Sequence, residues 1–222
     1  MRGASCRVLC WTCCGVTDPA PFFTRSDGSY LFARWGRPIA PVIFGAEDGS
    51  LPVLKGAFEA MSALTGHPLA ETDPELGANL LMFLVRNWEE LRAVPDLDRL
   101  VPDLHPLIGR LGAAEANQYR VFRFDPEEAG AGIRAAVVML RMDAQLSAMP
   151  AEALALGQAV QTMLLWSDTA FQVVPPLMAS DAGILLRPEV AAVLRAAYDP
   201  VMPVAARDPS HALRLAARMR LQ

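Results

Sequence analysis

Lysine is nearly missing from this sequence, and this bears on which kinds of partner the protein can bind. Of the 20 basic residues, Lys55 alone is lysine. Arginine in such excess, beside frequent alanine and leucine, is typical of a GC-rich genome rather than of a phosphate-binding surface. Nucleic-acid binding needs a concentrated cationic face. The net charge is −4 and basic residues gather only at the C-terminal end, so we exclude nucleic acid as a partner.

Catalytic motifs are missing as well. The three histidines, His67, His105 and His211, are isolated in sequence, and each is expected to be a surface or capping residue. No HExxH zinc motif, nucleophile elbow or Walker phosphate loop occurs. The 24 acidic residues do not nominate a pair for glycoside hydrolysis. We recognise no catalytic centre, and we expect neither a cofactor nor a bound metal.

One acidic stretch holds possible ligands for a hard metal ion. Asp96, Asp98, Asp103 and His105 lie among prolines at 95–106. The regular ligand spacing and the loop glycine of an EF-hand are missing there. A solvated acidic face is therefore the favoured interpretation.

Long apolar runs are absent too. No stretch of 18 or more apolar residues occurs, which excludes a transmembrane helix in this sequence. The longest candidate, residues 154–166, is interrupted by Gly157, Gln158 and Gln161. It is typical of a buried amphipathic helix. The hydrophobic fraction of 53% nevertheless suffices for a folded core.

Cysteine occurs only near the N-terminus, at Cys6, Cys10, Cys13 and Cys14. The spacing is too tight for a zinc finger, and no later cysteine could complete a disulfide framework. A short apolar patch between a basic start and a Pro-rich exit resembles a bacterial lipoprotein signal, with Cys13 or Cys14 as the lipidated residue. That patch is shorter than usual, and Trp11-Thr12 is bulky for such a site. Residues 1–20 are therefore either an export signal or a tail without a role.

The remaining chain alternates strand and helix patterns. Turn residues and β-branched or aromatic runs predict five strands, at 30–35, 39–44, 79–85, 119–124 and 133–142. The first two are expected to lie side by side. The nearly continuous apolar run 79–85 predicts a central strand covered on both faces.

Helical spacing and capping residues predict the helices. They are expected at 50–65, in short pieces within 86–116, and at 151–166, 189–198 and 211–220. A loop is expected around Pro175, Pro176 and Gly183. These elements predict an α+β (or α/β) fold with a mixed sheet of about five strands and three C-terminal helices. Residues 21–206 are expected to form a single domain, followed at 207–222 by an amphipathic helix.

Two surface features are candidates for partner contacts. Arg34 and Arg37 flank Trp35, and this combination can hold a carboxylate or stack on a ring; pairing with nearby acids at the sheet rim is the structural alternative. The C-terminal helix carries arginines around leucines, so it suits either an anionic lipid surface or packing on the domain with its arginines in solvent.

Several short motifs together resemble a poorly characterised proteobacterial family of exported proteins with a minimal zincin-like fold. They are Arg34-Trp35-Gly-Arg-Pro38-Ile39, Leu64-Thr65-Gly66, Gly77-Ala78-Asn79, Leu156-Gly157-Gln158-Ala159-Val160 and Leu194-Arg195-Ala-Ala-Tyr198-Asp199-Pro200. The resemblance implies that Gln158 stands at the second histidine of the zinc motif, with Leu154 at the first and Ala155 at the glutamate. Leu154 and Ala155 can neither ligate zinc nor move a proton.

Three functions therefore stay open. A non-catalytic envelope protein would hold an unknown peptide or protein partner in a protease-like cleft or at a sheet edge. An enzyme of unrecognised type would use dispersed acids and arginines. A cytoplasmic assembly or regulatory subunit would not use its cysteine tail. In the first case, membrane association depends on lipidation or on the C-terminal helix.

Overall fold

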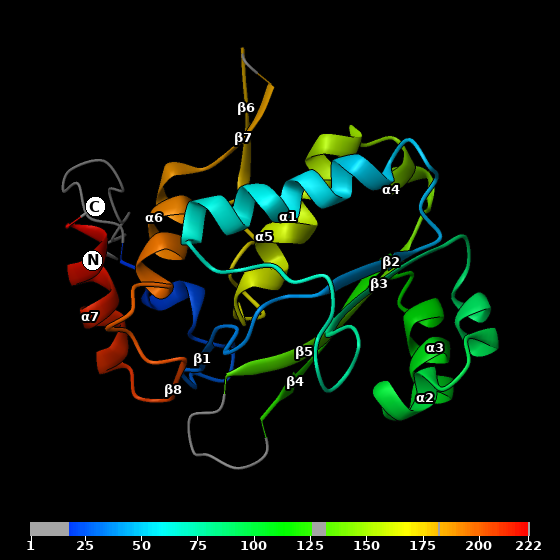
Figure 1. The fold of residues 1–222 in the computed structure, drawn as a ribbon, viewed down its shortest axis with the longest axis horizontal. Coiled ribbons are helices and arrows are strands. Elements are labelled where there is room, and N and C mark those ends of the chain that lie inside the picture. Colours follow the sequence, from blue (N-terminus) through cyan, green and yellow to red (C-terminus); the bar gives the residue numbers. More distant parts are fainter. Residues whose placement is uncertain (1–17, 126–131, 182, 222) are drawn as a thin grey trace, which may run out of the picture.

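The computed structural model describes residues 18–125, 132–181 and 183–221, which confirm the predicted α+β class. A mixed four-stranded sheet lies between helices on both of its faces (Figure 1). Two further pairs of strands form small sheets of their own. The possible lipidation site at Cys13 and Cys14 lies outside the described residues, so its role stays a prediction.

The strand order of the main sheet is β2-β3-β5-β4. Its first three strands, β2 (Pro41–Phe44), β3 (Leu80–Val85) and β5 (Ile133–Arg141), are parallel, and β4 (Gln118–Phe124) is an antiparallel edge strand. A parallel connection needs a crossover, and α1 (Leu51–Thr65) supplies it between β2 and β3. Gly66 ends α1 in the left-handed conformation with φ 69°, as its position in the sequence predicts.

Alternate residues of β3 and β5 enter two separate cores. Leu80 and Met82 face α1 and α5 (Ala151–Met163). Phe83 and Val85 face the other side. There, η2 (Trp88–Ala93), α2 (Leu97–Leu100) and α3 (Leu104–Ala113) cover the sheet, and these are the short helices expected within 86–116. The continuous apolar run of β3 is explained by this burial on both faces.

The predicted pairing of 30–35 with 39–44 is wrong. The first strand is reduced to β1 (Phe32–Ala33), which pairs antiparallel with β8 (Ala205–Ala206) near the other end of the chain. The chain does not turn back into a hairpin because Trp35 and Ile39, both buried in the first core, have different backbone partners. Trp35 forms a bridge to Ile133 and Ile39 forms one to Leu69.

The loop expected around Gly183 is a hairpin. Strands β6 (Leu177–Ser180) and β7 (Gly183–Leu186) pair antiparallel and project as an arm from the helix layer (Figure 1). Helix α5 also ends earlier than predicted, at Met163. The chain becomes extended there because Leu164 bridges Arg34.

The C-terminal helices pack on the first core. Helix α6 (Pro188–Ala197) begins at Pro188, and α7 (Ser210–Met219) lies against α6. In α7, Ala212 and Leu215 are buried while Arg214 is exposed, so this amphipathic helix packs on the domain. Short α4 (Ala144–Ser147) and η1 (Ala20–Phe22) complete the helices of the described chain. None of the helices in these residues is long and apolar enough to cross a bilayer.

The expectation that every histidine is a surface or capping residue is wrong for two of them, whose rings are buried against other parts of the fold. His211 is fully buried and His67 nearly so, whereas His105 is exposed. The ring of His67 is 2.9 Å from the carbonyl oxygen of Arg37. Tertiary packing buries these two rings. The fact that each histidine is isolated in the sequence does not indicate whether it is buried.

Candidate functional site

The sequence-predicted contact residues do not form one site. Trp35 is completely buried, and its Nε1 donates a 2.8 Å hydrogen bond to the carbonyl oxygen of Thr162. Arg34 lies beside it over the ring of Tyr198, and its Nη2 donates to the carbonyl oxygen of Met202 at 3.2 Å. Trp35 therefore joins the segment after β1 to the end of α5, and Arg34 joins it to the segment before β8.

Arg37 lies elsewhere, in an ion cluster at the rim of the sheet. Its guanidinium is 3.5 Å from Asp73, 3.1 Å from Glu75 and 3.4 Å from Asp125. Arg134 also contacts Glu75, at 2.8 Å. A cavity of about 300 Å³ adjoins this cluster. Its carboxylates are already engaged by arginines, which matches the structural alternative for Arg37.

Asp73 is fixed as an anion within this cluster. Burial by itself raises the pKa of its carboxyl group, but the backbone N–H groups of Leu76 and Glu75 and the side chains of Asn79 and Arg37 hold the pKa below its ordinary value. A carboxylate bound in this way is a poor proton acceptor. The cluster is therefore built for structure rather than for general base catalysis.

An unpaired backbone edge runs along β4. The carbonyl oxygen of Asn117 accepts a 2.8 Å hydrogen bond from the N–H of Arg141, and hydrogen-bonded pairs alternate from there along an antiparallel ladder. The backbone groups of Gln118, Arg120 and Phe122 therefore point away from β5. Among the described strands, none pairs with this outer edge.

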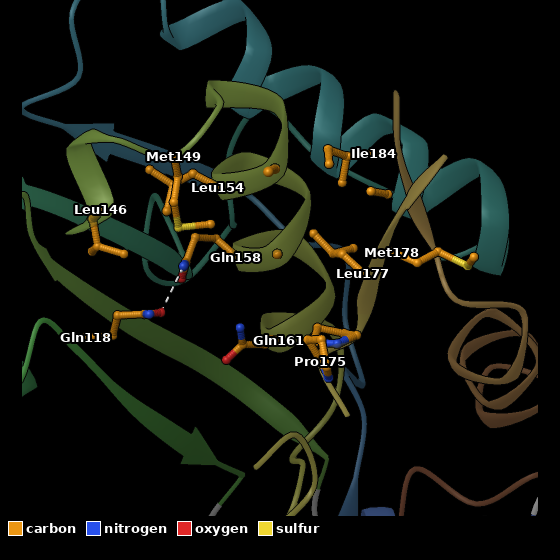
Figure 2. A pocket seen from close by; sticks show the side chains of 14 residues that line it. Gln118, Leu146, Met149, Leu154, Gln158, Gln161, Pro175, Leu177, Met178 and Ile184 are labelled. Atoms are coloured by element: carbon orange, nitrogen blue, oxygen red, sulfur yellow. Dashed lines mark hydrogen bonds between the residues drawn. The ribbon is translucent and has the colours of Figure 1, made fainter. Parts of the chain in front are cut away.

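The same three residues direct their side chains toward helix α5. Side chains of a strand alternate between its faces, so Gln118, Arg120 and Phe122 share one face. Gln118 accepts a 3.0 Å hydrogen bond from Nε2 of Gln158, which lies on α5 (Figure 2). The free edge of β4 therefore adjoins a cleft between β4 and α5.

Two neighbouring cavities make up this cleft. The hairpin cavity has a volume of about 240 Å³ and extends along α5 to the β6–β7 arm. Its lining includes Gln118, Leu154, Gln158, Gln161, Leu177 and Ile184. Figure 2 shows Gln118 on one side of α5, with Leu177, Met178 and Ile184 on the other. Its surface is mainly apolar, with carboxamides as its polar groups.

The arginine cavity is about 290 Å³ and lies further along β4. It shares Gln161 with the hairpin cavity, and Arg120, Phe122, Trp166 and Asp168 are among its other lining residues. One carboxamide therefore borders both cavities, and an elongated ligand can contact both. Apolar walls with a few polar groups are typical of binding sites.

Arg120 is the most unusual residue of the cleft. Its Nη2 donates to Oε1 of Gln118 at 3.2 Å and also to Oε1 of Gln158. Its Nε is fully buried and has no hydrogen-bond partner in the described part of the chain. Over those same residues, no carboxylate lies within ion-pair distance of this guanidinium.

The charge of Arg120 is consequently uncompensated. Burial lowers the pKa of its guanidinium to about 10, so the side chain still carries its positive charge at neutral pH. A buried cation normally has an anionic partner because desolvation of the charge is costly. The neutral carboxamides of Gln118 and Gln158 accept hydrogen bonds from Arg120 but do not neutralise its charge.

Sequence reasoning missed this site. The strand 119–124 was predicted, but nothing in it distinguishes Arg120, which faces α5, from Arg123, which donates to the carbonyl oxygen of Leu100 on the opposite face. The only signal was alternation, since it places Arg120 on the same face as the apolar Phe122. Recognising the cleft also required the location of α5, which depends on tertiary packing.

Metal binding has little support in the cleft. No group of three or more His, Cys, Asp or Glu side chains suited to a metal occurs within residues 18–125, 132–181 and 183–221. Leu154 offers no lone pair, and the carboxamide of Gln158 is already bound to the cation of Arg120. A metal ion there would meet a positive charge.

No protein-family model, curated protein or solved structure matches the chain.

Proposed function

We propose that this protein is a non-catalytic binding protein that holds an extended peptide segment of a partner in the cleft between β4 and α5. The observation that carries the proposal is a coincidence of two features at Gln118, Arg120 and Phe122. Their backbone groups form an unpaired edge, and the side chains of all three line the cleft beside it.

An extended peptide matches this arrangement because it can add a strand to the sheet. Backbone hydrogen bonds along an exposed edge supply affinity, and pockets for alternate side chains supply selectivity. The β4 residues 118–123 pair with β5 without a bulge, so their outward groups keep a regular spacing. The hairpin and arginine cavities lie along that edge and suit side chains of the bound segment.

The resemblance to a minimal zincin-like fold enters as part of this proposal. The side chains of Leu154 and Gln158, which the resemblance aligns with the two histidines of the zinc motif, both line the hairpin cavity. Ala155, aligned with the glutamate, is buried. A cleft furnished in this way supports retention of a peptide rather than its hydrolysis.

Alternating N-methylation of a bound peptide tests the proposed strand addition. A binder would be selected from a library of random short peptides on the immobilised full-length chain, and then resynthesised with one N-methyl group at each position. Binding should weaken by about tenfold or more at alternate residues and change little between them, because only every second N–H faces β4.

Two outcomes would overturn the proposal. One is a scan in which N-methylation has no effect or acts equally at every position. The other is a binder whose contacts, mapped by backbone amide shifts of the protein, lie away from residues 118–123. The intervening N-methyl positions serve as the matched control because they change the same peptide equally in size and polarity.

We further propose an envelope location, supported by the lipoprotein-like order of residues in segment 1–20. Metabolic labelling with a fatty-acid analogue, followed by membrane fractionation, tests it. Label should disappear in a Cys13→Ser, Cys14→Ser double variant. An unlabelled protein in the cytoplasmic fraction would favour the assembly or regulatory subunit instead.

A further inference from the structure

The guanidinium of Arg120 differs from those of the other two arginines of the described chain whose Nε is buried without a partner. Arg141, whose Nε is also buried and unpartnered, lies 3.7 Å from the carboxylate of Asp143. Arg34, the third such case, is bonded to carbonyl oxygens and lies against the ring of Tyr198. Arg120 has neutral carboxamides as its partners and borders a cavity.

We propose that Arg120 recognises a carboxylate group of the bound ligand, an inference that rests on the proposed peptide-binding function. A guanidinium offers five N–H donors in a planar fork that matches the two oxygens of a carboxylate. Nε of Arg120 has no acceptor among the described residues, and the side chain lines the arginine cavity. Binding would supply both the hydrogen-bond acceptor and the negative charge that the folded chain does not.

The surroundings favour one negative charge over two. Asp168 lines the same cavity as Arg120, and its carboxylate accepts hydrogen bonds from the backbone N–H and the hydroxyl group of Ser26. Those hydrogen bonds lower the pKa of Asp168 and keep it ionised. Because repulsion grows with the charge of the ligand, a carboxylate is accommodated better than a doubly charged phosphate.

The neighbouring carboxamide suits the same ligand. Gln161 borders both cavities, and no hydrogen bond engages its side chain in the residues that the structure describes. Its NH₂ group can donate to a carboxylate or to a peptide carbonyl. The carboxylate can come either from an aspartate or glutamate side chain or from the C-terminus of the partner.

Small probes separate these sources. Full-length protein labelled with ¹⁵N would be titrated with N-acetyl-alanyl-alanine, its C-terminal amide, and N-acetyl-aspartyl-alanine amide. The observable is the Nε–H resonance of arginine 120, assigned by comparison with an Arg120→Met variant. We expect a saturable shift with a carboxylate-bearing probe and none with the uncharged amide. The responding probe identifies the source as terminal or side-chain.

Variants provide the controls. In Arg120→Met, affinity for the responding probe should fall by about tenfold or more, since a charge-assisted hydrogen bond is lost. In Arg37→Met, which removes a guanidinium outside the cleft, affinity should be unchanged. Arg120→Lys keeps the charge without the planar fork and should bind with intermediate affinity.

The inference is wrong if carboxylate and amide probes behave alike, or if inorganic phosphate binds more tightly than either carboxylate probe. Its failure can be distinguished from failure of the proposed function. If a selected peptide binds equally to the original chain and to Arg120→Met, and the N-methyl scan still alternates, carboxylate recognition by Arg120 is rejected and strand addition is retained. If the carboxylate probes shift the Nε–H resonance but the N-methyl scan does not alternate, strand addition is rejected and carboxylate recognition is retained.

Discussion

The hydroxyl oxygen of Tyr30 lies 2.8 Å from Nδ1 of His211, although 181 residues separate them in the chain. Both side chains are buried, and the ring of His211 packs against Phe32 at 4.2 Å. Nε2 of His211 is buried without a partner in the described residues. The interior beside β1 therefore favours the neutral imidazole.

Stability should fall on acidification because of His211. Burial, with a smaller contribution from Arg214, lowers the pKa of His211 from 6.5 to about 4. Between these two pH values the unfolded chain binds a proton at His211 and the folded chain does not. The contribution of His211 to stability is therefore fully present above pH 6.5 and is lost as the pH falls through 4. Urea unfolding should give a free energy on the order of 2 kcal/mol lower at pH 5 than at pH 7.

A double variant, Tyr30→Phe with His211→Leu, is the control for this pH dependence. It removes both polar partners, so no orphaned hydroxyl group is left and stability at pH 7 should change little. Its unfolding free energy should vary less between pH 7 and pH 5. Some dependence of the unfolding free energy on pH should remain because of His67, since burial also lowers the pKa of His67. An unchanged slope would show that His211 is not the group responsible.

Arg120→Met and Arg37→Met should change stability in opposite directions. The first removes a partly buried charge that lacks an ionic partner, and it should raise the free energy of unfolding by about 1 kcal/mol. The second leaves the buried carboxylate of Asp73 without its cation and should lower it by about 1–2 kcal/mol. Urea denaturation at pH 7 measures both. A large loss of stability in Arg120→Met would mean that this arginine is a structural element.

Gly45→Ala should be far more damaging than Gly28→Ala. Both glycines have positive φ, 76° and 82°, so alanine costs about 1 kcal/mol of backbone strain at either position. A Cβ atom at Gly45 would also lie 2.1 Å from the carbonyl oxygen of Leu84, whereas Gly28 faces open space. We expect a loss of about 3 kcal/mol or more for Gly45→Ala in thermal or urea unfolding. Equal losses would show that β2 and β3 approach less closely.

Purified protein should not retain stoichiometric zinc. Leu154 and Ala155 have no donor atoms, and Gln158 lies beside the positive charge of Arg120. After dialysis against zinc and then against buffer, metal analysis should find far less than one zinc per chain. Stoichiometric zinc that is lost in a Gln158→Ala variant would contradict the non-catalytic interpretation of this helix.

Local patterns in the sequence predicted most of the regular elements. Gly66 ends α1 because only a residue that tolerates positive φ fits there, and this can be read from its position. Alternation and apolar runs located β3, β4 and β5 to within one or two residues. These features depend on neighbouring residues, which a sequence contains.

Long-range relationships could not be predicted in the same way. The pairing of β1 with β8 joins Phe32 to Ala206, and two-residue strands leave no repeating pattern to recognise. The arrangement around Arg120 depends on the position of α5, which follows β4 by more than twenty residues. A candidate site assembled from a strand and a distant helix becomes visible only when both are placed in space.

The junction of β1 and β8 has a consequence for synthesis. A growing chain emerges from the ribosome with Phe32 and Trp35 long before Ala205, Ala206 and α7. Until then, the large apolar side chains around β1 are not covered by their later partners, and such a state is prone to association with other molecules. Maturation of this half of the molecule should therefore be a late, all-or-none event, while the region of α2 and α3 can settle beforehand.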